Sequence, residues 1–166
     1  MPLENKILMS LITFKEVNFS LRDIGYLDNI AVNRNRLLFD VDFDVRLKEK
    51  EHVEILLHIE YVHLIDENTK ELTPIFHGDF ISIFKMDAVR EYLATEGENV
   101  LLKKEVLESM LGITVSTTRG YLLAKTKGSA IYDFPLPIIY PQELIDSKLE
   151  KEEIYGDFFP ITNRDK

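Results

Sequence analysis

The sequence contains no cysteine and no tryptophan, and it has no long apolar run. Without cysteine the chain cannot form disulfides, iron–sulfur clusters or thiolate zinc sites, and it has no cysteine nucleophile. No uncharged apolar stretch approaches the roughly 18 residues that a membrane-spanning helix needs. Residues 1–10 also lack the apolar core of a secretory signal. We therefore expect a cytoplasmic protein without a membrane partner.

Basic residues are also scarce, because 20 Lys and Arg stand against 29 Asp and Glu for a net charge of -9. Nucleic acids and anionic bilayers bind basic protein surfaces, so the excess of acidic residues argues against both as partners. The length of 166 residues suits a single domain whose core needs no metal or disulfide. We assign this domain to residues 1–153 and treat 154–166 as an aromatic and polar tail, either a packed strap or a detachable peptide.

Alternation of apolar and polar residues predicts four strands. The clearest is 39–47, where every second residue is apolar and Asp40, Asp42 and Asp44 lie on the opposite side. Short polar turns separate the later strands, so we expect them to be antiparallel neighbours. The other three predicted strands are 7–19, 53–64 and 72–84.

Helical spacing follows the strands. Leu102, Val106 and Met110 form one stripe, which predicts a long helix over 101–126, although the β-branched run inside it favours a strand. A short helix is expected over 87–92, and Pro141 opens a final amphipathic helix over 142–153. The predicted fold class is α+β: a four-stranded antiparallel sheet followed by a long helix and a C-terminal helix.

No residues converge in the pattern of a catalytic or metal site. His58 and His63 are five residues apart on one predicted strand, so their side chains point to opposite faces. His58 and His77 could meet across strands, but we find no third group to join them. The aspartates of strand 39–47 are best explained as a solvated face, and no phosphate loop or nucleophile elbow is present. We therefore expect neither enzyme activity nor a cofactor.

The uncharged segment 134–140 (FPLPIIY) cannot pair fully into a sheet because of its prolines. It either fills the core or forms one wall of an apolar groove, with a strand face as the floor. Such a groove would bind extended apolar peptide with little selectivity, at about 25 cal/mol per Å² of buried surface. The residues predicted to bind peptide are Leu136, Ile138, Ile139 and Tyr140 from the wall, and Phe39, Val41, Phe43, Phe76 and Phe80 from the floor.

The order of several short motifs resembles the SecB family of export chaperones, over roughly residues 7–149. Residues 14–19 (FKEVNF) are similar to the family's first-strand pattern, and residues 76–83 (FHGDFISI) to its glycine-containing fourth strand. Residues 118–120 (TRG) stand where the family has a Ser-Arg-Gly-like triplet in its long helix. The proline-containing loop of the family is matched by residues 136–144 (LPIIYPQEL).

The resemblance implies an ATP-independent chaperone, or holdase, which binds unfolded polypeptides for protein transport and assembles as a homotetramer, a dimer of dimers. In this family acids on the sheet dock on the export motor SecA, and Glu16 matches one of them. Ser20 and Pro74 stand where further acids are expected, and residues 33–36 (NRNR) replace a tryptophan. These departures leave open a chaperone that serves one toxin–antitoxin pair, a dedicated interaction protein for one cognate partner, and a relative that no longer binds unfolded chains.

Overall fold

The structure is a computed structural model, and it describes residues 8–22, 36–48, 51–149 and 156–163. Within these ranges the chain forms seven β-strands, two α-helices and two short 3-10 helices. The strands are β1 (Met9–Leu21), β2 (Leu37–Lys48), β3 (His52–Asp66), β4 (Glu71–Met86), β5 (Leu93–Glu96), β6 (Asn99–Lys103) and β7 (Phe158–Asn163). The α-helices are α2 (Lys104–Lys125) and α3 (Pro141–Leu149), and the 3-10 helices are Val89–Tyr92 and Ala130–Asp133.

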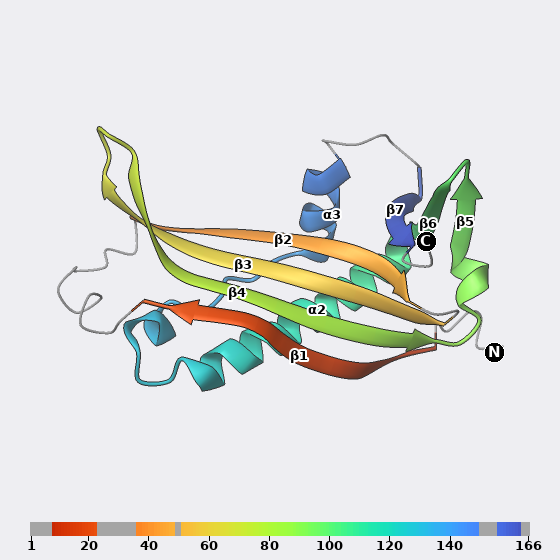
Figure 1. Cartoon of the computed structure of the whole chain (residues 1–166), viewed down its shortest axis with the longest axis horizontal. Helices are drawn as coiled ribbons and strands as arrows, with labels where there is room; N and C mark the ends of the chain where they lie inside the picture. The colour runs from red at the N-terminus through yellow and green to blue at the C-terminus, as the bar shows by residue number, and fades with distance from the viewer. Residues whose placement is uncertain (1–7, 23–35, 49–50, 150–155, 164–166) are drawn as a thin grey trace.

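The strands form one mixed sheet in the order β1-β4-β3-β2-β7-β6-β5 (Figure 1). All neighbours are antiparallel except β2 and β7, which run parallel. The predicted fold class, a four-stranded antiparallel sheet followed by a long helix and a C-terminal helix, is therefore wrong. Seven strands rather than four build the sheet, and its strands are not all antiparallel.

The sequence analysis did not predict β5, β6 and β7, for two physical reasons. β5 and β6 form a short hairpin turned by Gly97, whose φ of +61° favours glycine. Leu102 matched the helical stripe but lies in β6, so α2 begins only at Lys104. β7 comes from the predicted tail and pairs with β6 and with the end of β2. Pairing between segments so distant in the sequence leaves no local periodicity to read.

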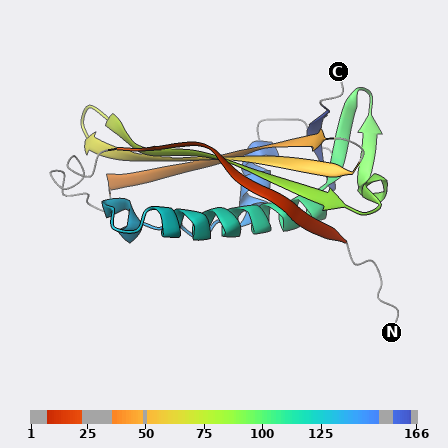
Figure 2. The same cartoon turned by 60° about the horizontal axis from the view of Figure 1, so that its bottom comes forward.

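Helix α2 runs along one face of the four long strands, and the core lies between them (Figure 2). Its β-branched residues Thr114, Val115 and Thr118 are buried, so packing overrides their preference for a strand. No helix in the described ranges covers the opposite face of these strands (Figure 2). The buried residues of this layer include Phe43, Val45, Ile55, Leu57, Ile59, Phe80 and Phe84 from the strands and Val106, Leu107, Met110 and Leu111 from α2.

Residues 134–140 lead from the far end of α2 to α3 without regular structure, as their prolines require. Pro141 begins α3, which packs against α2 and carries Lys148 to the edge of β2. There the Lys148 ammonium donates to the Phe43 carbonyl oxygen and lies 3.1 Å from Asp42 and 3.2 Å from Asp44. Helix α3 is described as far as Leu149, and the rest of the helix predicted to 153 lies outside the described residues.

Candidate functional site

A row of aromatic rings crosses the four long strands at the end of the sheet away from β5. Strand register places Phe39 of β2 opposite Tyr61 of β3, and Tyr61 opposite Phe76 of β4. Successive ring centroids are 6.3 Å apart for Phe39–Tyr61, 5.9 Å for Tyr61–Phe76 and 5.3 Å for Phe76–Phe19. These separations lie in the range of favourable aromatic contacts, so the row forms a continuous apolar surface on the α2 face.

Gly78 makes room for this row on β4. A Cβ atom at Gly78 would lie 2.6 Å from the Phe76 ring and 2.7 Å from the Phe80 ring. The two rings therefore converge over a position that only glycine can occupy without displacing them. Phe80 continues the aromatic packing toward β1 and α2, where its ring centroid lies 6.0 Å from Phe14 and 5.8 Å from Tyr121.

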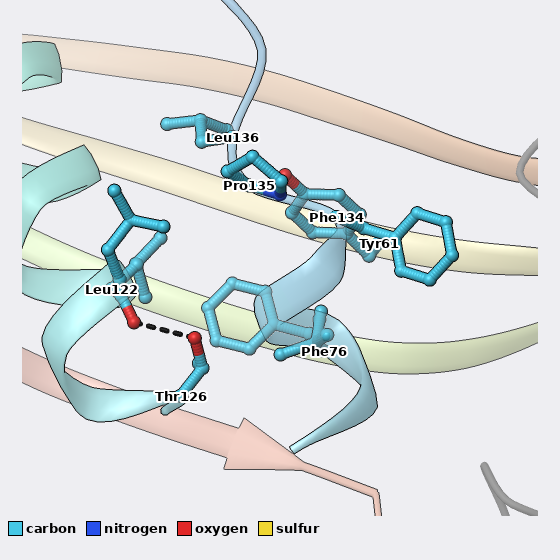
Figure 3. Close-up of a pocket in the computed structure, with 9 residues that line it drawn as sticks. Tyr61, Phe76, Leu122, Thr126, Phe134, Pro135 and Leu136 are labelled. Carbon is cyan, nitrogen blue, oxygen red and sulfur yellow. Dashed lines mark hydrogen bonds between the residues drawn. The ribbon is translucent and has the colours of Figure 1, made fainter. Parts of the chain in front are cut away.

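A small cavity of about 20 Å³ lies beside the aromatic row, enough space for roughly one water molecule. Figure 3 shows its three sides: the rings of β3 and β4, the last turn of α2, and the start of the proline-rich loop. The Thr126 hydroxyl lines the cavity but already donates to the Leu122 carbonyl oxygen at 2.7 Å. The lining residues are Tyr61, Phe76, Leu122, Leu123, Thr126, Ile131, Phe134, Pro135 and Leu136.

The Tyr61 hydroxyl is the polar group of this cavity that lacks a hydrogen bond. Tyr61 is 4% exposed, and no residue of the described chain donates to its oxygen or accepts from it. Burial raises the pKa of Tyr61 to about 12, although the nearby Arg119 guanidinium acts in the opposite direction. The hydroxyl is therefore neutral at every physiological pH and remains available as a donor.

Next to this cavity, the edge of β2 away from β3 has no strand partner among the described residues. Alternate residues of an antiparallel strand direct their backbone groups toward opposite neighbours. The Phe43 and Val45 carbonyl oxygens accept from side chains of α3 and β7, so these residues face the edge away from β3. By the same alternation Phe39 and Val41 face that edge, and β7 pairs only with the last residues of β2. On that edge, away from β3, no described strand pairs with the backbone of Phe39 and Val41, and the Phe39 side chain is 48% exposed.

The structure separates the predicted peptide-binding residues into four groups. Phe76 and Leu136 line the cavity, and Phe39 and Val41 lie on the neighbouring open strand. Phe43 and Phe80 are fully buried in the core rather than exposed as a groove floor. Ile139 packs partly against the core, whereas Ile138 and Tyr140 point outward and are 69% and 60% exposed.

Sequence reasoning did not select Tyr61 or the helix residues that complete the cavity. Tyr61 continues the apolar alternation of β3 and carries no local signal that separates it from its core neighbours. Leu122 belongs to the predicted long helix, and Phe134 lies in the segment predicted as the wall without being named as a peptide-binding residue. Their convergence depends on where the end of α2 meets β3 and β4, which neighbouring residues in the sequence do not specify.

Glu16, the predicted partner-binding acid, lies on the α2 face of β1. Its carboxylate accepts from the Tyr121 hydroxyl at 2.8 Å and from the Lys125 ammonium. The hydrogen bond from Lys125 outweighs burial and holds the pKa of Glu16 below its usual value. These contacts attach β1 to α2, and a role for Glu16 in docking a partner stays a prediction.

On the opposite face of the sheet, Asp79 joins the two histidines for which the sequence offered no third group. Its carboxylate lies 2.8 Å from a ring nitrogen of His58 and 3.2 Å from one of His77. Partial burial acts to raise the pKa of Asp79, but the contacts with the two histidines outweigh it and lower that pKa. In the described ranges no group of three or more His, Cys, Asp or Glu residues is arranged to hold a metal ion.

Comparisons with known proteins do not identify a family. No family model matches the sequence, and no curated protein matches it significantly. A crystal structure of a protein of unknown function from Streptococcus agalactiae is similar at 11% identity and a TM-score of 0.34, over 81% of this chain and 96% of that one. A TM-score this low supports no conclusion about the fold or the function of this chain.

Among the described helices, none combines the length and apolar character needed to cross a membrane.

Proposed function

We propose that this protein is a cytoplasmic, ATP-independent holdase that binds extended apolar segments of non-native polypeptides. One observation carries the proposal: the edge of β2 at Phe39 and Val41, which no strand of the described chain occupies, lies beside an aromatic row and cavity. An exposed strand edge can pair with an added peptide strand through main-chain hydrogen bonds, which do not depend on the side chains of that peptide. The resemblance of the sequence motifs to SecB chaperones supports the same function.

Apolar contacts would supply most of the affinity. Burial of one Leu or Phe side chain contributes about 1.5–3 kcal/mol, so several such contacts are needed for micromolar binding. The cavity of about 20 Å³ is too small for such a side chain in its present form. Phe134 and Pro135 are only partly buried, and we propose that they move aside when a side chain enters. The exposed Ile138 and Tyr140 of the same loop offer further apolar contacts.

The experiment measures binding to a reduced and alkylated model protein that stays unfolded in buffer. Light scattering follows complex formation, and fluorescence anisotropy gives the affinity. The variant is Phe39→Asp, which replaces the half-exposed aromatic ring of Phe39 on β2 by a charged carboxylate. The matched control is Val17→Asp, because Val17 is a similarly exposed strand residue, 56% against 48%, at a register irregularity of β1.

We expect wild type and Val17→Asp to bind, and Phe39→Asp to bind about ten- to a hundredfold more weakly, as the loss of one buried aromatic contact requires. A wild-type protein that ignores the unfolded chain rejects the proposal. So does an equal loss in both variants, because the site would then lie elsewhere. Competition among unrelated unfolded proteins distinguishes a holdase, which binds them all, from an interaction protein for one partner such as SecA or a toxin–antitoxin pair.

A further inference from the structure

The lining of the cavity restricts the chemistry of any guest. Apart from the Tyr61 and Thr126 hydroxyls, its side chains are hydrocarbon or aromatic, and none carries a charge. A guest ammonium would lose its hydration without gaining an ion partner, and it would lie near the Arg119 guanidinium that acts on Tyr61, which is strongly unfavourable. The guest group at the cavity is therefore not a cation, and its bulk is apolar.

Tyr61 supplies a single directional contact in this apolar setting. Its hydroxyl is buried and has no partner among the described residues, whereas the Thr126 hydroxyl is committed to the Leu122 carbonyl oxygen. Buried polar groups in folded proteins are nearly always hydrogen-bonded, so a lone hydroxyl on a cavity wall points to a ligand that completes it. Because burial keeps this phenol protonated, it can donate to a neutral acceptor.

We propose that the Tyr61 hydroxyl donates a hydrogen bond to a backbone carbonyl oxygen of the bound chain, next to the apolar side chain that enters the cavity. This inference rests on the proposed peptide-binding function and identifies the Tyr61 hydroxyl as the polar group that contacts the bound peptide. A backbone carbonyl is a neutral acceptor that occurs at every residue of a polypeptide. The cavity would therefore distinguish a peptide from other apolar molecules without selecting one sequence.

The test compares Tyr61→Phe with Thr114→Val. Thr114 carries another buried hydroxyl without a partner, but it lies in the middle of α2 and does not line the cavity. Both substitutions remove an oxygen and leave the shape nearly unchanged. The probes are a labelled synthetic peptide with one Phe in an otherwise small and polar extended sequence, and Nile red, a neutral apolar dye without a peptide backbone.

We expect both variants to be at least as stable as wild type, because neither loses a hydrogen bond of the free protein. Tyr61→Phe should bind the peptide about three- to tenfold more weakly, the equivalent of one hydrogen bond, and bind Nile red unchanged. Thr114→Val should bind the peptide as wild type does. A set of peptides is then compared in which one amide at a time is replaced by an alkene. One of these replacements should lower the peptide affinity of wild type by the same factor and leave the peptide affinity of Tyr61→Phe unchanged.

Three results overturn the inference. Unchanged peptide affinity in Tyr61→Phe shows that the hydroxyl does not contact the guest, while the holdase proposal stands. A loss of stability in Tyr61→Phe shows that the hydroxyl already has a structural partner in the free protein. If wild type does not bind the peptide or the unfolded model protein, the proposed function fails and the inference fails with it.

Discussion

Replacement of Gly78 by alanine is the most direct test of the aromatic row. The added Cβ would lie 2.6 Å from the ring of Phe76 and 2.7 Å from that of Phe80. Both distances are well inside van der Waals contact, so at least one ring must move. Phe80 is fully buried between its aromatic neighbours, whereas Phe76 faces the cavity. We therefore expect Phe76 to move and to fill the cavity.

The size of the effect follows from overpacking a buried site. One extra methyl group in a well-packed core typically costs about 1–3 kcal/mol. For a chain of this length each kcal/mol lowers the melting temperature by about 2–4 °C. We therefore expect Gly78→Ala to melt about 2–12 °C below wild type. Because Phe76 lines the cavity, the affinity for an unfolded chain should fall as well.

The assay is thermal unfolding followed by circular dichroism, together with anisotropy binding to the unfolded model protein. The control is Gly120→Ala, because a Cβ atom at Gly120 meets nothing within 4 Å and the position lies inside α2. Alanine should stabilise this helix by about 0.5–1 kcal/mol. If Gly78→Ala is as stable as Gly120→Ala and binds normally, the rings do not converge over Gly78 and the described site is wrong.

Two further predictions concern how β1 and β7 are held. Lys125→Met should destabilise the protein by less than about 1 kcal/mol at neutral pH, because it removes a partly exposed ion pair with Glu16. Lys125 lowers the pKa of Glu16 from 4.5, so this stability is present above pH 4.5 and is lost as the pH falls through the native pKa. Urea titrations across acid pH should thus show a flatter decline in the variant, and an unchanged decline would contradict the assignment. Phe159→Ala should cost about 3–5 kcal/mol in urea unfolding, because Phe159 is buried against Phe43 at a ring separation of 5.5 Å. The control Phe158→Ala replaces a half-buried ring and should cost less, and equal costs would show that β7 is not packed as described.

Local sequence patterns could predict which side chains share a face, because strand geometry sets that directly. The alternation of 39–47 predicts that Phe39, Val41 and Phe43 point to one side, and in β2 they do. The same pattern could not predict how exposed each residue is. Phe43 is covered by Phe159 and by Lys148, whereas Phe39 packs against the Tyr61 ring of β3 and stays half exposed.

Long-range pairing explains why the predicted fold class was wrong. β7 adds to the sheet through contacts with β2 and β6, and these partners lie far from it in the sequence. In β6, Leu102 is buried at a spacing that also fits the helical stripe of α2. A single apolar residue satisfies both patterns, so the pairing of Leu102 with Leu93 and Phe159 decides that this segment is a strand.

The sequence by itself determined the composition-level properties and the local preferences: no thiol chemistry, an acid excess, alternating strands, and a proline-rich segment that cannot join a sheet. Each depends on single residues or on neighbours along the chain. The tertiary structure alone decided the seven-stranded sheet formed by the described residues, the position of β2 in it and the cavity beside Tyr61. These features depend on where distant segments meet, and that is set by packing of the whole core rather than by any local pattern.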